Sequence, residues 1–445
     1  MTYAARAKEA TWFGQPRGLT VLFLTNMWEQ FSYFGMRALL VYYMTTTLLL
    51  DQEAASSTYG FYTAFAYFTP IIGGTVADRW LGKRRAVTIG ATVMAAGHFM
   101  MAFEPLFYPA LATIALGNGL FLPTLPSQIN DLYGPDDPRR GWAYNVYYVG
   151  INIGGFLAPL VCGTLGEVYG WHYGFAAAGV GMVAGLIIYL WGARYLPEAR
   201  TPAALVESDS PQRSFRGTAL VLVAVGLSVT VFRGAYEQVG NTVALWTESV
   251  NRVAGGFTIP MTWFQSLNPL LVIVLTPLLL TRWKRKADSG REKSPMQKMA
   301  LGALVVGLAY VLLAAAALLN PGGAHWLWLA AFFFLFTLGE LYILPTGLGL
   351  FARLAPPRFG ATTVAAWYLA IFSGSLTAGL VGSFWSSMTP PIFFLLLAVI
   401  AAIAAGMLLA LDRSARRIDA IRAAEIDEDR AAAVVPEAMK RPLHG

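Results

Sequence analysis

Five ionisable residues of this 445-residue chain lie inside long apolar stretches, where an unpaired charge is costly and usually serves a function. They are Glu29, Arg37, Arg233, Glu237 and Glu340. Buried acids and bases of this kind can hold the charged groups of a solute or exchange protons. No nucleophile stands beside a base in these stretches, so we predict no catalytic residue. The expected chemistry is binding and proton transfer.

The first apolar stretch carries its polar residues at intervals of three or four. This spacing places them on one face of a helix. The residues are Asn26, Glu29, Gln30, Tyr33 and Arg37. A polar face inside a membrane helix cannot face lipid without loss. It lines a cavity or forms a hydrogen-bonded seam with another helix, and two full charges favour the cavity.

The charged residues of the later stretches each allow two interpretations. Arg233 and Glu237 are four residues apart on one helix face, where they can neutralise each other. Alternatively, Glu237 exchanges partners as parts of the protein move. Glu340 has no charged neighbour within a helical turn, so it is either protonated or available to a cation.

Metal and cofactor sites are not expected. The single cysteine, Cys162, cannot form an internal disulfide, and the four histidines lack metal-ligand spacing. A glycine string over 179–185 lacks the preceding strand of a dinucleotide loop and is more typical of close helix packing. We therefore predict neither a metal nor a cofactor.

The elements that position the charged residues are predicted to be membrane-spanning helices. Charged residues make up 13% of the chain, against roughly 25% in soluble domains, which excludes an ordinary soluble enzyme. Twelve apolar stretches are long enough to span a bilayer. They cover 18–48, 56–77, 86–105, 107–132, 141–166, 171–194, 216–248, 258–282, 298–319, 325–353, 359–386 and 390–411.

The distribution of positive charge predicts the topology. Of 32 Lys and Arg residues, all but Arg37, Arg233 and Arg252 fall at the termini or in and beside loops that follow even-numbered spans. By the positive-inside rule, both termini lie in the cytoplasm. The outward-facing loops then carry Asp51, Glu53, Glu104, Glu167 and Glu248. The net charge of +7 needs no nucleic-acid partner to explain it.

A polar connection divides the spans into six and six. We predict an N-terminal six-helix bundle over 1–195, a cytoplasmic linker over 196–214 with three prolines, and a C-terminal six-helix bundle over 215–411. A cytoplasmic tail over 412–445 is expected to begin as a surface helix. The fold class is an all-α membrane protein made of two six-helix halves.

Short motifs resemble those of known transporters. The segment over 73–85, with Asp78 and Arg79, is similar to the cytoplasmic motif of the major facilitator superfamily, which implies a gate and structural latch. Over nearly all spans the chain resembles the proton-dependent oligopeptide transporters of that superfamily. The motifs are the span-one pattern from 26 to 37, Tyr67 with Pro70, the 147–154 segment with Asn152, the 264–269 segment with Asn268, Glu340 with Pro345, and Trp367.

The resemblance implies the major facilitator fold, with a central cavity for a di- or tripeptide. Arg37 would hold the peptide carboxylate and Glu340 the amino group. The remaining binding residues would be Asn152 and Asn268 for the backbone, with Tyr33, Tyr67 and Trp367 as pocket walls. Guanidinium groups bind carboxylates with two hydrogen bonds, and amides offer both a donor and an acceptor.

This chain departs from the family pattern at the proton-coupling positions. Asn26 replaces an acid, and Gln30 and Leu122 replace bases. If coupling is retained, we expect it to run through Glu29 or Glu237, with Arg233 in place of a lost base.

The predicted function is proton-driven import of di- and tripeptides by alternating access, in a monomer of the inner membrane. The alternative is a transporter of peptides or another small solute with weak or no proton coupling. A membrane enzyme or a sensor is disfavoured, since the spans hold no catalytic pair and no signalling domain is attached.

Overall fold

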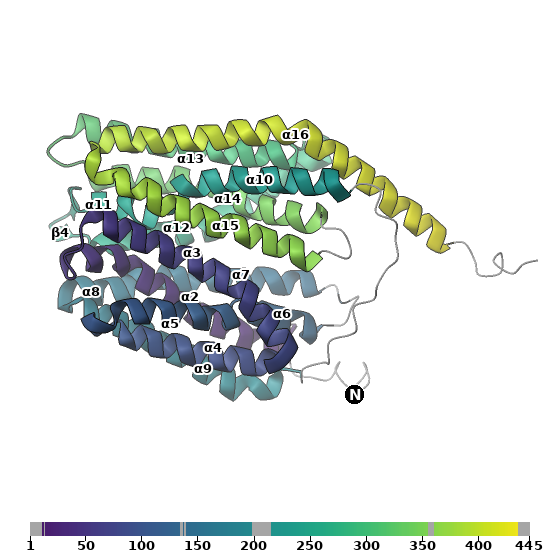
Figure 1. Ribbon diagram of the computed structural model, residues 1–445, viewed down its shortest axis with the longest axis horizontal. Coiled ribbons are helices and arrows are strands. Elements are labelled where there is room, and N and C mark those ends of the chain that lie inside the picture. Colours follow the sequence, from purple (N-terminus) through teal and green to yellow (C-terminus); the bar gives the residue numbers. More distant parts are fainter. Residues whose placement is uncertain are drawn as a thin grey trace, which may run out of the picture.

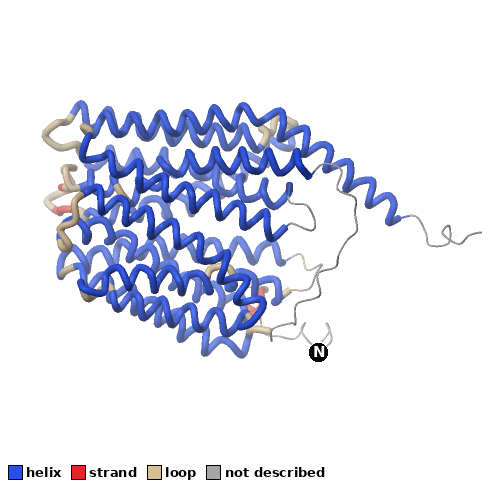
Figure 2. The backbone as a smooth tube through the Cα atoms, viewed as in Figure 1, coloured by secondary structure: helices blue, strands red, loops and turns tan. Residues whose placement is uncertain are grey.

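The computed structural model describes residues 11–12, 14–133, 137, 139–197, 215–354 and 360–434. These residues are almost entirely helical, as Figures 1 and 2 show. Two two-stranded hairpins, β1–β2 (Thr11–Trp12, Gln15–Pro16) and β3–β4 (Val253–Ala254, Phe257–Thr258), are the strands among them. The helices provide the architecture.

The N-terminal half holds the first six predicted spans. Its elements are α2 (Arg17–Thr46), α3 (Gln52–Val76), η1 (Ala77–Leu81), α4 (Lys83–Met100), η2 (Glu104–Leu106), α5 (Phe107–Phe121), α6 (Thr124–Leu132), α7 (Arg139–Ala158), η3 (Pro159–Gly163), α8 (Thr164–Tyr169), α9 (Trp171–Gly192) and η4 (Ala193–Tyr195).

The C-terminal half holds the other six. Its elements are α10 (Phe215–Tyr236), η5 (Glu237–Gly240), α11 (Thr242–Thr247), η6 (Met261–Ser266), α12 (Leu267–Asp288), α13 (Pro295–Leu319), α14 (Trp326–Leu354), α15 (Gly360–Ser383), η8 (Phe384–Ser387) and α16 (Pro390–Val434).

Helices lie at all twelve predicted span positions. Nine of the helical segments in the described part of the chain are long and apolar enough to cross a membrane. The helices at the first three positions, α2, α3 and α4, are 30, 25 and 18 residues long and carry more polar residues. The multi-span prediction agrees with this architecture.

Prolines lie inside several spans or at points where a span is divided, since a proline has no N–H group for the helical hydrogen bond. Pro70 lies inside α3 and Pro345 inside α14. Pro123 separates α5 from α6, and Pro159 begins η3, a short π-helical turn between α7 and α8. These breaks divide spans four and five, which the hydropathy pattern predicts as continuous.

The two halves lie side by side in Figure 1, with α3 of one half along α15 of the other. Within the halves, α2 packs on α7 and α9, and α13 packs on α14 and α16. The closest approach of α3 to α15 uses two glycines. A Cβ atom added to Gly60 would lie 2.5 Å from the Cα atom of Gly379. Small residues permit such contact between membrane helices.

The two ends of the bundle differ in charge. The end that carries α11 and β4 holds Asp51, Glu53, Glu104, Glu167 and Glu248, and we call it the acidic end. The opposite end holds the start of α2 and, at the start of α4, the Lys83–Arg85 segment, and we call it the basic end.

The helix α16 continues through residue 412, the predicted start of the tail, and projects past the bundle in Figure 1. Asp412 accepts hydrogen bonds from Ser294 and from Gln297 (3.1 Å), and so ties α16 to the start of α13. Most of the predicted linker, over 198–214, and the end of the tail, over 435–445, lie outside the described residues. The domain boundaries stay predictions.

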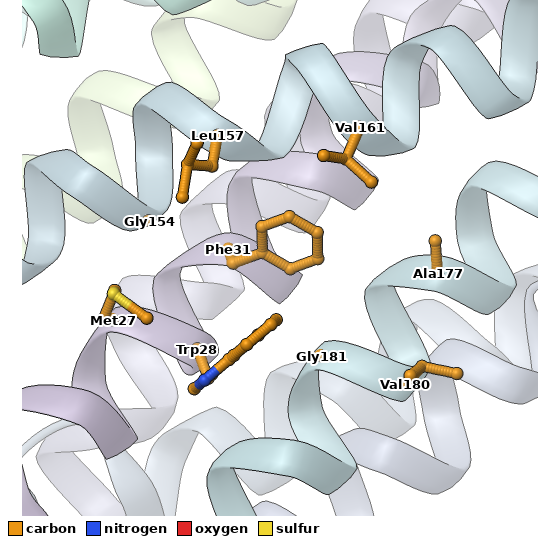
Figure 3. A pocket seen from close by; sticks show the side chains of 9 residues that line it. All are labelled: Met27, Trp28, Phe31, Gly154, Leu157, Val161, Ala177, Val180 and Gly181. Carbon is orange, nitrogen blue, oxygen red and sulfur yellow. The ribbon is translucent and has the colours of Figure 1, made fainter.

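An apolar crevice of about 440 Å³ lies within the N-terminal half, between α2, α7 with η3, and α9 (Figure 3). Trp28 and Phe31 from α2 form one wall, and Leu157 and Val161 form another. None of the five span-embedded ionisable residues lines it. The polar face of α2 therefore belongs to a different site.

Candidate functional site

Glu237 lies between two guanidinium groups that come from different halves. It begins the η5 turn at the end of α10 and is 1% exposed. Arg37 of α2 donates from Nη2 to Glu237 Oε2 at 2.5 Å, and Arg233 donates to the other carboxylate oxygen. Arg37 Nε also donates to the hydroxyl of Tyr59 at 2.7 Å. One buried carboxylate thus joins the two halves.

Arg233 also contacts two aromatic rings, and one of them belongs to the other half. Its guanidinium carbon lies 5.3 Å from the ring centre of Tyr67 in α3 and 5.3 Å from that of Tyr236. A guanidinium at this distance from a ring is attracted to its π-electrons. The predicted pair of Arg233 and Glu237 is present, and it is one part of a cluster that also contains Arg37.

Glu340 of α14 is held by neutral donors only. The hydroxyl of Tyr236 donates to Oε1 at 2.8 Å, and Asn268 Nδ2 donates to Oε2 at 2.5 Å. Asn268 also donates to Thr337 Oγ1 at 3.1 Å. No ion pair of Glu340 forms among the described residues, so its carboxylate is available to a cation.

The site therefore has two poles of opposite charge. Arg37, Arg233 and Glu237 together carry one excess positive charge when ionised, and Glu340 carries one negative charge. Tyr236 connects them, because its ring lies beneath Arg233 and its hydroxyl binds Glu340. Such a site can hold a zwitterion with its anionic group at the arginines and its cationic group at Glu340.

Glu29 is a separate buried acid without a cation. It is 1% exposed and accepts a hydrogen bond from Gln30 Nε2 at 2.7 Å. It is close enough to Tyr62 and Tyr147 for electrostatic interaction. Asn26 donates to the backbone oxygen of Tyr147 at 3.2 Å. The face of α2 thus forms a helix seam at Asn26 and an ion pair with the other half at Arg37; the cavity expected along this face stays a prediction.

Three predicted binding residues form no hydrogen bond with the charged side chains of the two poles among the described residues. Asn152 donates to the backbone oxygen of Tyr148 in its own helix at 2.9 Å. Tyr33 is 8% exposed, and its hydroxyl has no partner among the described residues. Trp367 packs in the core of the C-terminal half, with its ring 5.2 Å from that of Phe351.

The predicted gate residues, Asp78 and Arg79, lie exposed in η1. Neither side chain forms a hydrogen bond or an ion pair with another residue that the structure describes. The ion pair at this corner is between Lys83 and Asp131, at 2.7 Å, and it links α4 to α6. Sequence reasoning missed this pair, because 48 residues separate its members.

Two tyrosines of the site were also missed. Tyr59 binds Arg37 and Tyr236 binds Glu340. Tyr236 stands directly before Glu237 and three residues after Arg233, which was a local signal of its importance. Its contact with Glu340 spans 104 residues, and no spacing in the sequence reveals it.

A bundle of membrane helices in two halves, with paired charges buried between the halves, defines a multi-pass membrane transporter. The comparisons with known proteins identify the family. The chain belongs to the POT family, whose model matches residues 84–210 and 210–393.

Relatives and solved structures agree with this family. The chain is 33% identical to a di-/tripeptide transporter of Lactococcus lactis subsp. cremoris, over 90% of this chain and 96% of the relative. It is 33% identical to the peptide transporter YePEPT of Yersinia enterocolitica, over 84% and 88%. A crystal structure of a mutant POT peptide transporter in complex with alafosfalin matches with a TM-score of 0.85 and 30% identity, over 93% and 98% of the chains.

These similarities confirm the predicted fold class, an all-α membrane protein with the major facilitator fold. They also confirm the predicted family and a transporter rather than an enzyme.

Proposed function

We propose that this protein imports di- and tripeptides by proton symport, through alternating access of its two halves. The observation that carries the proposal is the pair of oppositely charged poles at the boundary between the halves. A short peptide is a zwitterion with its charges at opposite ends. Relatives that are named as peptide transporters, at 33% identity, support the same substrate class.

In this proposal the peptide carboxylate binds Arg37 and its ammonium group binds Glu340. Asn268 donates to Glu340, which supports its proposed role of binding the peptide backbone beside that acid. Asn152, Tyr33, Tyr67 and Trp367 remain proposed contributors to the pocket. Recognition through termini and backbone would tolerate many peptide side chains.

Glu237 is the proposed coupling residue. A protonated Glu237 loses its attraction for Arg37 and Arg233. The bond between Arg37 and Glu237 joins the two halves, so its loss favours their separation and frees Arg37 for the peptide carboxylate. Glu29, which has no cationic partner, is a second proposed protonation site.

We infer that the structure represents the state open to the cytoplasm. Hydrogen bonds between described residues of the two halves lie at the acidic end and in the middle of the bundle; examples are Gln52 to Gly382 at 2.8 Å and Tyr42 to Ala244 at 2.8 Å. By the positive-inside rule the acidic end faces outward and both termini are cytoplasmic. The proposed location is the inner membrane, and the proposed state is a monomer.

The test is Glu237→Gln in proteoliposomes with labelled dialanine. Uptake driven by a pH gradient should collapse, because the amide cannot carry a proton, while peptide exchange without a gradient persists. Glu53→Gln is the matched control, since Glu53 is an exposed acid at the acidic end. Unchanged driven uptake in Glu237→Gln would exclude Glu237 as the coupling residue.

The second candidate function, transport with weak or no proton coupling, is favoured by a specific observation. Glu29 is bound by the neutral side chain of Gln30, and Asn26 donates to a backbone oxygen. No cation lies beside Glu29 in these hydrogen bonds. Dialanine uptake in the parent protein that ignores the pH gradient would establish this candidate instead.

A further inference from the structure

Glu167 accepts three hydrogen bonds from the opposite half of the protein. It lies in α8 at the acidic end. Its Oε2 accepts from the backbone N–H of Met261 at 2.9 Å, and its Oε1 accepts from the N–H of Thr262 at 2.8 Å and from Thr262 Oγ1 at 2.7 Å. Both carboxylate oxygens are thus occupied by donors from η6.

These bonds give η6 the cap that its own sequence lacks. The first N–H groups of a helix have no partner within it, and a side chain before the helix usually accepts from them. Pro260 precedes η6 and supplies no side-chain cap. Glu167 takes this role from the other half, and its negative charge suits the start of a helix.

Neighbouring contacts hold η6 against the N-terminal half. Trp263 Nε1 donates to Thr164 Oγ1 at 2.8 Å, Gln265 Nε2 to Ala38 O at 3.3 Å, and Ser266 Oγ to Phe156 O at 2.8 Å. A Cβ atom added to Gly163 would collide with the side chain of Thr262. The η6 turn is therefore hydrogen-bonded to the opposite half and closely packed against it.

The same turn leads directly into the substrate site. The helix α12 begins at Leu267, directly after η6, and its second residue is Asn268. Asn268 donates to Glu340 at 2.5 Å. The backbone therefore connects the capped turn directly to a residue that binds Glu340.

We propose that Glu167 is a positioning residue that closes the acidic end by capping η6 across the two halves, and that releasing this cap opens that end. The consequence for transport rests on the proposed peptide-transport function. The capping role does not depend on that function, since the cap is a contact within the protein.

Spin labels at the acidic end test the capping without any substrate. Tyr169→Cys and Val253→Cys place one label on each half at exposed positions, while the natural Cys162 is buried. In the parent protein we expect one population of short distances. Glu167→Ala should add a longer-distance population, with a shift of the equilibrium of about tenfold or more, because bonds to a charged acceptor are among the stronger ones.

Matched variants separate capping from a general loss of structure. Glu53→Ala removes an exposed acid at the same end and should leave the distances unchanged. Thr262→Val removes the hydroxyl donor and should give a smaller opening, which Thr262→Ser should reverse. Glu167→Ala with the parent's distances, or equal opening in Glu53→Ala, would overturn the proposal.

Dialanine uptake in the same proteins distinguishes the two proposals. Glu167→Ala should raise the KM for dialanine and retain counterflow exchange. If the parent transports no dialanine but Glu167→Ala still opens the acidic end, the capping role stands and the peptide function fails. If the parent transports dialanine and the distances do not respond to Glu167→Ala, the capping role fails alone.

Discussion

Glu237 is buried and Glu340 is half-buried, and their neighbours give these two acids different chemistry. Glu237 is bound by two arginines, so its charge is already compensated inside the protein. Glu340 is bound by a tyrosine and an asparagine, which leave its charge uncompensated. A buried charge without a partner is unfavourable. Glu340 is therefore the acid that gains most from a cationic ligand.

This difference predicts the effect of Glu340→Gln on substrate binding. The amide keeps the shape and loses the charge, so the KM for dialanine should rise by about tenfold or more, since hydrogen bonds to charged groups contribute about 1.5–3 kcal/mol. Initial rates of uptake in proteoliposomes measure this change.

A modified peptide provides the control for Glu340. N-acetyl-dialanine lacks the ammonium group, so the parent should prefer dialanine strongly and Glu340→Gln should discriminate much less. If the variant keeps the parent's preference for the free amino group, Glu340 does not bind it.

At the scale of single residues, the sequence indicated contacts within one helix better than contacts between helices. The spacing of Arg233 and Glu237 indicated a pair as one of two alternatives, and the structure contains that pair. The bond from Arg37 to Glu237 spans 200 residues and depends on how the halves meet. Glu167 was predicted only as an outer-loop acid, because its donors from η6 lie 94 and 95 residues away.

At the scale of elements, hydropathy placed the spans because lipid requires long apolar helices. The predicted span over 171–194 and α9 (Trp171–Gly192), for example, differ by two residues at one end. The local turns η5 and η6 were not predicted. Each departs from the α-helix where a side chain meets the other half, and that contact is absent from the local sequence pattern.

The crossing of α3 and α15 carries a prediction about stability. Gly60→Ala would place a Cβ atom 2.5 Å from the Cα atom of Gly379 and 2.8 Å from its nitrogen. Overpacking of this kind typically costs about 1–3 kcal/mol. The melting temperature in detergent should fall, because the backbones cannot yield as a flexible side chain would.

A second glycine in a span makes the control for this prediction. Gly406 in α16 is exposed on the bundle surface, and a Cβ atom added there meets nothing within 4 Å. Gly406→Ala should leave the melting temperature at or above that of the parent, since alanine favours a helix more than glycine does. A similar loss in both variants would mean that the α3–α15 contact is not specific.

At the scale of the whole molecule, the bonds between the halves and the buried charges take part together in the proposed mechanism. The Arg37–Glu237 bond and the Glu167 cap both join the halves; the bond lies in the proposed substrate site, and the cap holds the turn that leads into it. Opening of the acidic end requires that these bonds break together or in sequence. A proton on Glu237 and a peptide on Arg37 would replace the bond that is lost.

The charge that moves with each transported peptide predicts how the membrane potential acts on transport. The two arginines and three glutamates inside the spans sum to one negative charge when all are ionised. A zwitterionic peptide adds no net charge, so each proton that accompanies it moves one positive charge inward. At equal pH on both sides, a negative-inside potential should therefore accelerate dialanine uptake, because the potential contributes about 2.3 kcal/mol per charge per 100 mV. A potassium gradient with valinomycin in proteoliposomes supplies the potential. Glu237→Gln should abolish the acceleration, and a parent protein indifferent to the potential would show that peptide moves without a proton.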